Sequence, residues 1–455
     1  MHRSRFGGCN GCGFRSRYPL QPLLGGATLR EVRDPIWRDL RSITEHHGDI
    51  DSASQLGRNG VSATGRRMDT QHGLDPVARA RELGAAIAAA CDAIEGTRRI
   101  PEPLLARLHD SRLLRMLLPR SAGGDQTEPG TYLRAVEEVA RHDGSLAWNV
   151  FVANSSALIA AFLEETVART IFADPTALMA WGPPNATRAT GVAGGYRLSG
   201  TWDFASGCRN ATWMGAHAHV VEPDGSLRRN RRGQPTIRTL LFPAEQATLI
   251  DTWNTIGLRG TASDSYSVSD LFVPEAFSTT REDPALRREP GPLYAFTMQG
   301  LYAVGVAGVA LGIAGAMLAE FIGLAMRKSP RALGRLADNA VIQADVARAE
   351  AKLGAARAYL VDTLGSIYAQ ADDVDPIDVA DRARVRLACT NAIHGAIEVA
   401  DFTYKAAGVD AIFPGTPFER RFRDIHTLSQ QIQSRGAHYE AVGQVLLGMP
   451  PENFL

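Results

Sequence analysis

Residues 196–204 read YRLSGTWDF and mark the point where the chain changes from helical to strand-like patterns. Three further stretches look like strands, 211–221, 239–242 and 266–272. Gly, Pro and Asp-Gly turns separate these stretches, as expected for the short strands of one small sheet. The middle of the chain is therefore predicted to form a β domain.

Helical patterns flank this β domain on both sides. Before it, helices are expected over 76–94, from Ile100-Pro101 onward, over 132–141 and over 145–162. After it, long helices are expected over 300–326, 338–370, 379–407 and 418–447. We therefore predict an α+β fold with an N-terminal helical domain (68–178), a middle β domain (179–285) and a C-terminal four-helix bundle (286–455).

The composition gives no sign of nucleic acid or a membrane as a partner. The chain has 49 Lys plus Arg and 49 Asp plus Glu, so it lacks the basic excess that such partners favour. Its five cysteines are scattered and odd in number, which favours a reducing cytoplasm over a disulfide framework. Cys9 and Cys12 form a CxxC, but no second pair follows at ligand spacing, so no metal site is predicted.

One segment is long and apolar enough to cross a bilayer. Gly300–Ala319 carries no charge. However, it is dominated by Gly and Ala, Glu320 follows at once, and no aromatic belt flanks it. We interpret it as a helix buried at the centre of the bundle.

Residues 1–67 differ from the rest of the chain. They are rich in Gly, Arg and Ser, show no sustained period, and contain eleven Arg against six Asp plus Glu, a net charge of five. Such a segment cannot bury enough apolar surface to offset the entropy of ordering it. We expect a disordered extension, and one interpretation is that the native protein starts at Met68, just before the first helical pattern.

Short motifs recur in a fixed order through residues 75–450. They are Ile100-Pro101, Leu113-Leu114, Leu118-Pro119 and Gly123-Gly124, then Gly200-Thr201-Trp202 and Ser206-Gly207, then 257–264 (GLRGTASD) with Val273-Pro274, and finally Arg421-Phe422-Arg423-Asp424. Each motif alone is weak evidence for a protein family. In this order, and with this succession of helices and strands, the chain resembles the acyl-CoA dehydrogenase superfamily. The resemblance implies that the middle β domain is a β-barrel domain.

The resemblance implies a flavin, FAD or FMN, at the entry to the β domain. Trp181, Gly182, Trp202, Ser206 and Gly207 are the residues expected to line it. A flavin needs apolar walls for its flat ring and a few placed hydrogen-bonding groups at its rim. Two alternatives stay open: Trp202 can be an aromatic of the β core, and Ser206 can be a turn residue before Gly207.

The resemblance also implies a site for the dinucleotide half of FAD. Arg327 is expected to reach a phosphate of the neighbouring subunit's cofactor, and Gln343 is also expected to bind the cofactor. The alternative for Arg327 is a cation at a helix carboxyl end. The family's glycine-rich turn is reduced here to Ala406-Ala407-Gly408, which leaves FMN open beside FAD.

The carboxylate base of a dehydrogenase is missing. Removing a proton beside a thioester carbonyl requires a positioned base. Family dehydrogenases carry it just after the Arg-Asp motif or on the first bundle helix. Here residues 425–433 read IHTLSQQIQ and Gly300–Ala319 has no acid, so neither position holds a carboxylate.

The runs WDFASGC (202–208) and HTLSQQ (426–431) instead look like two-component flavin monooxygenases built on the same fold. That resemblance implies reduced flavin from a partner flavin reductase, O2 as oxidant, a small aromatic or heteroaromatic substrate, and a homotetramer. Two other hypotheses remain: an FAD-dependent acyl-CoA dehydrogenase, and a non-catalytic scaffold that binds no flavin.

Gln431 departs from the pattern of those monooxygenases, which place a histidine near this position. Glutamine cannot act as a general base. Either His426, about one and a half turns earlier on a helix, takes that role, or the substrate needs no deprotonation. A third interpretation is that His426 is a packing histidine. Ser206, Gln431 and His426 are therefore the predicted catalytic residues.

Overall fold

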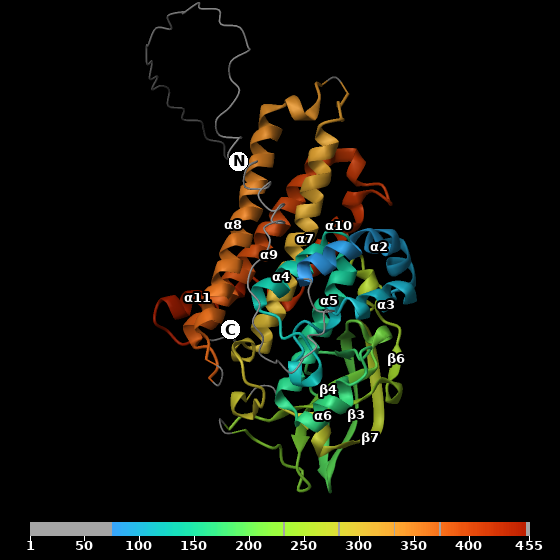
Figure 1. Cartoon of the computed structure of the whole chain (residues 1–455), viewed down its shortest axis with the longest axis vertical. Helices are drawn as coiled ribbons and strands as arrows, with labels where there is room; N and C mark the ends of the chain where they lie inside the picture. The colour runs from blue at the N-terminus through green and yellow to red at the C-terminus, as the bar shows by residue number, and fades with distance from the viewer. Residues whose placement is uncertain (1–74, 231–232, 281–282, 332, 373–374, 452–455) are drawn as a thin grey trace, which may run out of the picture. The chain divides into compact units, whose positions relative to one another are not determined.

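The computed structural model describes residues 75–230, 233–280, 283–331, 333–372 and 375–451. The predicted extension 1–67 and the Cys9–Cys12 motif lie outside these residues. The chain divides after Thr70, and the unit Gln71–Leu455 is described here. Its elements follow the predicted order of helices, strands and helices, which confirms the α+β class (Figure 1).

Most of the N-terminal helices bury one apolar face, whereas Gly144–Ala157 is buried all round, and Pro stands at the first turn of three of them. They are α2 (Pro76–Thr97), α3 (Glu102–Asp110), α4 (Pro129–Ala140), α5 (Gly144–Ala157) and α6 (Glu165–Phe172). The helix expected over 145–162 ends as an α-helix at Ala157 and continues as the 3-10 turn η3 (Leu158–Phe162). Helix α6 was not predicted from the sequence.

The middle of the chain forms one eight-stranded sheet. Its strands are β1 (Met179–Trp181), β2 (Arg188–Val192), β3 (Gly195–Ala205), β4 (Trp213–Val221), β5 (Ile237–Pro243), β6 (Thr248–Ile250), β7 (Asp264–Pro274) and β8 (Ser278–Thr279). The order is β6-β7-β3-β2-β4-β5-β8, and β1 pairs with β4. The four predicted strands correspond to β3, β4, β5 and β7, whereas the short strands β1, β2, β6 and β8 were missed.

The sheet curls around its own core. The buried side chains of β3, β4, β5 and β7 share one cluster, and Trp202 stacks on Tyr266 at its centre. Strands β5 and β7 contact one another although three strands separate them in the sheet order. The hydrogen-bonded path nevertheless stays open between β6 and β8, so the predicted barrel is a curled sheet without full closure.

The C-terminal part contains three long helices that run side by side, α7 (Met298–Ala325), α8 (Ala340–Gln370) and α9 (Val379–Ala407) (Figure 1). The shorter helices α10 (Pro417–Leu428) and α11 (Ala437–Leu446) pack against them. The prediction of one fourth helix over 418–447 is wrong. The helix stops at Leu428, the 3-10 turn η12 (Ile432–Ser434) follows, and α11 starts after Gly436.

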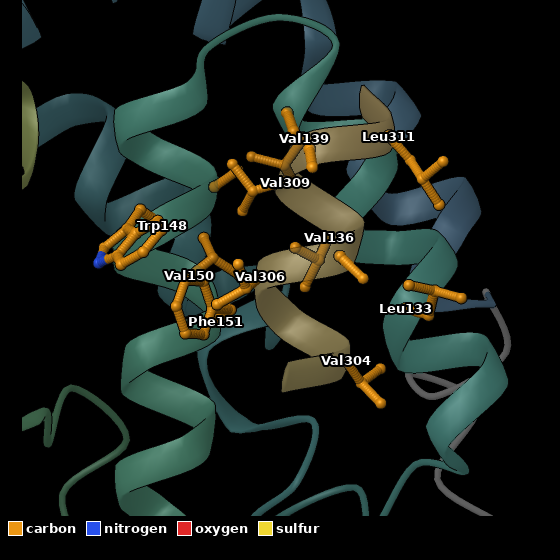
Figure 2. Packing of buried hydrophobic residues seen from close by; sticks show 14 of the residues in the cluster. Leu133, Val136, Val139, Trp148, Val150, Phe151, Val304, Val306, Val309 and Leu311 are labelled. Atoms are coloured by element: carbon orange, nitrogen blue, oxygen red, sulfur yellow. The ribbon is translucent and has the colours of Figure 1, made fainter. Parts of the chain in front are cut away.

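Helix α7 lies at the centre of the main hydrophobic core. Figure 2 shows Val304, Val306, Val309 and Leu311 of α7 between the apolar side chains of α4 and α5. The described residues include two segments that are long and apolar enough to span a membrane, Gly144–Phe162 and Met298–Ala325. Both are almost entirely buried inside the protein, as expected for core helices.

Small residues let α4 and α7 approach closely. A Cβ atom built on Gly312 would lie 2.4 Å from the Glu137 carbonyl oxygen and 2.5 Å from the Ala140 Cβ. Gly315, one turn further along α7, faces a more open side, where the nearest atom is the Arg141 Nη1 at 3.6 Å. The contact between α4 and α7 therefore depends on the missing side chain at Gly312.

We predict that Gly312→Ala lowers the free energy of unfolding by about 1–3 kcal/mol, because the added methyl forces the two helices apart. The matched control Gly315→Ala is expected to be neutral or to stabilise the helix by up to about 1 kcal/mol, because alanine has the higher helix propensity. Urea denaturation followed by circular dichroism measures both. Equal effects of the two substitutions would contradict this account of the packing.

Candidate active site

Two loops of the β domain meet through buried hydroxyl groups. One loop follows β3 and contains Ser206 and Gly207, and the other precedes β7 and contains Thr261 and Ser263. The hydroxyl oxygens of Ser206 and Ser263 are 2.7 Å apart, and those of Ser263 and Thr261 are 2.8 Å apart. The Gly207 amide also donates to the Thr261 carbonyl at 2.9 Å. The two loops are thereby joined into one unit.

Both loops hold residues in the left-handed backbone region. Phe204, Leu258 and Ala262 have φ angles of 61°, 49° and 42°, and Gly207 has 77°. Non-glycine residues adopt this region at an energetic cost, and such residues concentrate at binding and catalytic sites. Phe204 also leaves 61% of its side chain exposed beside Trp253. The strained backbone and the exposed aromatic ring mark this place as a candidate site.

Helix α5 supplies the third wall of the site. It begins at Gly144 because the Asp143 carboxylate accepts the Leu146 amide at 2.7 Å and caps the helix. Trp148 Nε1 donates to Ser206 Oγ at 3.0 Å, and Asn149 Nδ2 donates to the Gly260 carbonyl at 3.2 Å. The site therefore joins one buried helix to the two strained loops.

One polar atom of this site has no partner. Asn149 is 95% buried, and its Oδ1 accepts no hydrogen bond from the described residues. This oxygen faces the Gly207 turn, 3.6 Å from where a Cβ atom would stand on that glycine. Buried carbonyl oxygens without partners are rare in proteins. The atom is therefore available to accept an N–H group of a bound molecule.

A buried carboxylate fixes the start of the second loop. Asp424 on α10 accepts the Leu258 amide at 2.6 Å, while Gly257 packs so tightly that a Cβ would lie 2.1 Å from the Arg423 carbonyl oxygen. Burial, followed by the nearby Asp143 carboxyl, raises the pKa of Asp424 to about 7. Burial likewise raises the pKa of Asp143. The Arg-Asp motif thus positions the loop that carries Thr261 and Ser263.

The structure distributes the predicted flavin residues over two environments. Ser206 and Gly207 lie in the joined loops, whereas the Trp202 ring is fully buried, and its Nε1 donates to the His217 carbonyl at 3.0 Å. This placement favours the alternative that Trp202 is a core aromatic. Trp181, at the end of β1, is half-buried with its edge on the His217 ring. Gly182 follows it, with no space for a side chain beside the Asp203 carbonyl oxygen.

Arg327 and Gln343 lie near the turn between α7 and α8, and both side chains are exposed. Arg327 follows the last residues of α7, and Gln343 in the first turn of α8 donates to the Ala337 carbonyl at 2.8 Å. No described contact joins either residue to the Ser206 loops. Their role in binding a dinucleotide stays a prediction that concerns a neighbouring subunit.

His426 and Gln431 do not share a helix, which corrects the helical spacing assumed from sequence. His426 lies on α10 with its Nε2 3.0 Å from Asp401 Oδ1 and its ring against Phe422. Gln431 lies after that helix, where its side-chain oxygen accepts the Gln433 amide at 2.6 Å and caps η12. In the part of the chain that is described, neither residue contacts Ser206. Their catalytic roles stay predictions.

Sequence reasoning missed Trp148, Asn149 and Ser263. The first two lie in an apolar run that was interpreted only as a core helix, although a Trp-Asn pair inside such a run is itself a signal. Ser263 lay within the GLRGTASD motif, but nothing in the sequence indicated that its hydroxyl meets that of Ser206. No group of three potential metal ligands occurs among the described residues.

These residues fit the edge of a flavin. A flavin offers a flat apolar ring, ring N–H donors and carbonyl acceptors. The site offers the Ser206 hydroxyl, the unpartnered Asn149 oxygen, the backbone of the Gly207 turn and the aromatic rings of Trp148 and Phe204. The residues present can therefore hold a flavin rim through hydrogen bonds and leave its faces to apolar contacts.

Comparisons with known proteins identify the family of this chain. The family model described as acyl-CoA dehydrogenase, C-terminal domain, matches residues 304–435. Indole-3-acetate monooxygenase of Pseudomonas putida is 31% identical over 343 residues, which cover 74% of this chain and 84% of that protein. The oxygenase component of an FADH2-dependent resorcinol hydroxylase from Rhizobium sp. is 28% identical, covering 79% of this chain and 90% of that protein.

Among solved structures, XiaF from Streptomyces sp. in complex with FADH2 and glycerol has the same fold, with a TM-score of 0.76 at 24% identity. The matched region covers 83% of this chain and 96% of the XiaF chain. The chain belongs to the acyl-CoA dehydrogenase superfamily. Within that superfamily it is a flavin-dependent monooxygenase and thus an oxidoreductase that uses reduced flavin.

We predict that the Asp424 carboxyl makes the protein less stable as the pH rises. Its folded-state pKa lies above the unfolded value of 3.8, so the folded protein holds the proton more tightly. The free energy of unfolding should therefore fall between about pH 4 and pH 7, by at most about 1.4 kcal/mol per pH unit, and then level off. Urea denaturation at pH 5 and pH 8 measures this fall.

Asp424→Asn keeps an oxygen that can accept the Leu258 amide but removes the ionisation. The variant should lose most of the pH dependence and be at least as stable as the parent at pH 8, with Asp143 responsible for the remainder. Asp270→Asn is the control, because Asp270 is an exposed carboxyl in the β domain. This variant should keep the parent's slope of unfolding free energy against pH. If the free energy of unfolding of Asp424→Asn depends on pH as it does in the parent, other groups cause the pH dependence.

Proposed function

We propose that this protein is the oxygenase component of a two-component system that hydroxylates or oxygenates a small aromatic or heteroaromatic compound. A separate flavin reductase supplies the reduced flavin, and O2 is the oxidant. One oxygen atom enters the substrate and the other leaves as water, with the two electrons coming from the flavin. The residues that hold the flavin edge in this proposal are Ser206, Asn149 and the Gly207 turn.

The observation that carries the proposal is the missing carboxylate base. The segment after α10, where family dehydrogenases hold a base, presents Gln431 and Gln433 instead, and the first 20 residues from Gly300 carry no acid. Amide groups can orient a substrate but cannot abstract a carbon-bound proton. Oxygen insertion into an aromatic ring has no need of that step, so the site suits a monooxygenase and not a thioester dehydrogenase.

The burial of the site supports the same chemistry. Trp148, Ser206 and Ser263 are all nearly inaccessible to solvent, and Trp148 packs edge-on against Phe151 at 4.8 Å. A dry pocket prevents water from diverting a reactive oxygen species before it meets the substrate. The Ser206 hydroxyl, held by Trp148 and Ser263, is a preorganised group next to which the oxygen chemistry can occur.

The relatives support the substrate class and the partner. Their names refer to indole-3-acetate and to resorcinol, which are aromatic compounds, and one is the oxygenase component of an FADH2-dependent hydroxylase. We carry these properties to this chain only as classes: an aromatic substrate, FADH2 or FMNH2, and a reductase partner. The His426 ring is held by Asp401, and no described contact joins it to Ser206, so this proposal assigns His426 no proton transfer.

The proposed assembly is a cytoplasmic homotetramer. Exposed apolar side chains at the carboxyl end of α7 and in the turn after α9 support an interface between copies: Ile322, Met326, Val409, Ile412 and Phe413. Exposed apolar groups of this kind are typical of protein interfaces. Arg327 lies beside this surface, where it can reach a neighbouring subunit's cofactor.

We predict that the purified full chain binds FMNH2 or FADH2 at least about tenfold more tightly than the oxidised form of the same flavin, a difference of about 1.4 kcal/mol. Anaerobic fluorescence titration measures this ratio. Oxygen consumption should require an added flavin reductase with its reductant. A dehydrogenase would instead carry oxidised FAD that bleaches with an acyl-CoA, and a scaffold would bind no flavin; either result would overturn the proposal.

Ser206→Ala should raise the fraction of reduced flavin that ends as hydrogen peroxide. Loss of a hydrogen bond worth about 1 kcal/mol corresponds to roughly a fivefold change in the ratio of peroxide released to product formed. Ser265→Ala is the matched control, because Ser265 is a buried hydroxyl of the same domain that contacts Asp203 and Thr252 and not the Ser206 cluster. Peroxide is assayed against product. Unchanged coupling in Ser206→Ala would remove this hydroxyl from the mechanism.

A further inference from the structure

Arg386 is a buried cation without a counter-charge. It lies on α9 with only 1% of its surface exposed. Its Nη1 donates to the Gln433 side-chain oxygen, while its Nε and Nη2 have no hydrogen-bond partner. No described carboxylate forms an ion pair with it. Burial lowers the pKa of Arg386, and the nearby Cys389 thiol acts in the opposite direction.

The two free nitrogens share one edge of the guanidinium group. Nε and Nη2 point to the same side, where they form the fork that binds a carboxylate through two parallel hydrogen bonds. A buried arginine without such a partner is strongly unfavourable, because its charge has lost the solvation of water. The free edge of Arg386 therefore has the form of a site for an anion that the protein itself does not provide.

Arg386 is linked to the segment that replaces the dehydrogenase base. Gln433, which accepts from Arg386, donates through its Nε2 to Gln299 on the first turn of α7 at 3.0 Å. The Gln433 amide donates to the Gln431 side chain at 2.6 Å. One series of hydrogen bonds thus runs from Gln431 to the guanidinium group, so the cation is linked to the segment that carries the predicted residue Gln431.

Aromatic rings connect this cation to the Ser206 hydroxyl. Trp148, which donates to Ser206, contacts Phe151 at 4.8 Å, and Phe151 contacts Tyr302 at 4.9 Å between ring centroids. Tyr302 lies three residues after Gln299, on the same side of α7. A series of contacts through Trp148, Phe151 and Tyr302 thus leads from the Ser206 hydroxyl to the turn of α7 whose Gln299 is bonded to Gln433.

We infer that Arg386 binds the carboxylate of an aromatic carboxylic acid and so makes arylacetate-type acids the substrate class of this enzyme. The inference rests on the proposed function, since it names the substrate of that same site. The aromatic part lies along Trp148, Phe151 and Tyr302, toward Ser206, and the carboxylate occupies the free edge of the guanidinium. The name of the indole-3-acetate monooxygenase relative describes an acid of this class.

Arg386 is not needed to hold the Gln431–Ser434 segment in place. His438 Nε2 lies 2.7 Å from the Ile432 carbonyl oxygen, and His394 Nε2 lies 2.9 Å from that of Ser434. The Ser434 hydroxyl also donates to the Leu428 carbonyl at 3.0 Å. Because three contacts hold the segment, loss of Arg386 should affect ligand binding more than structure.

The test compares an acid with its uncharged amide on the same enzyme. The full chain, saturated with FADH2 under anaerobic conditions, is titrated calorimetrically with indole-3-acetate and with indole-3-acetamide. The parent should bind the acid at least about tenfold more tightly, or by about 1.4 kcal/mol. In Arg386→Met the affinity for the acid should fall by at least about tenfold, while the affinity for the amide should change by less than about twofold.

Two further measurements separate recognition from folding. Arg386→Met should melt at or above the parent's temperature, because the substitution removes an unpaired buried charge. Indole-3-acetate should raise the melting temperature of the parent and not that of Arg386→Met. If Arg386→Met does not fold, Arg386→Lys serves instead: it keeps the charge without the fork and should lose part of the preference for the acid.

Failure of this inference is distinguishable from failure of the proposed function. If reduced flavin binds and O2 is consumed, but the parent does not prefer the acid or binds neither ligand, the substrate assignment is wrong and the monooxygenase proposal stands. Equal losses for acid and amide in Arg386→Met would also overturn the assignment, because they indicate a general structural effect. If reduced flavin does not bind at all, the proposed function itself is wrong.

Discussion

Two buried carboxylates, Asp143 and Asp424, position the parts from which the site is built. Asp143 caps the helix that carries Trp148 and Asn149, and Asp424 accepts the amide at the start of the loop that carries Ser263. Burial raises the pKa of both carboxyls, and the Asp143 carboxyl adds to the rise at Asp424 because two negative charges in a dry interior repel. The protein retains this unfavourable pair where a helix domain, a β domain and a bundle helix meet, and the geometry of the site depends on it.

The chemistry follows from what the site contains and what it lacks. Its donors are hydroxyl and indole groups, its unpartnered acceptor is the Asn149 carbonyl oxygen, and its buried charge is the Arg386 guanidinium. Hydroxyl groups can stabilise charge that develops on oxygen, but they are poor bases at neutral pH. Such a site suits a reaction in which the flavin and O2 supply the reactivity while the protein orients the substrate and excludes water.

Sequence patterns predicted the long elements and missed the short ones. Helix α7 could be recognised because an uncharged run of Gly and Ala residues can only be a core helix or a membrane span. Strands β1, β6 and β8 have only two or three residues each, too few to show any period. The break between α10 and α11 was also missed, because a single apolar period runs through both helices and nothing before Gly436 interrupts it.

The family and the absence of a carboxylate base could be established from the sequence alone, because motif order and residue identity are properties of the chain itself. Which side chains meet was decided only by the tertiary structure. Ser206 and Ser263 are 57 residues apart, and Arg386 and Gln433 are 47 apart, so no local pattern joins them. The directions of His426 toward Asp401 and of Trp202 into the β core likewise depend on packing between distant elements. The unpaired edge of Arg386 is visible only in three dimensions, because whether a charge has a partner depends on every residue that surrounds it.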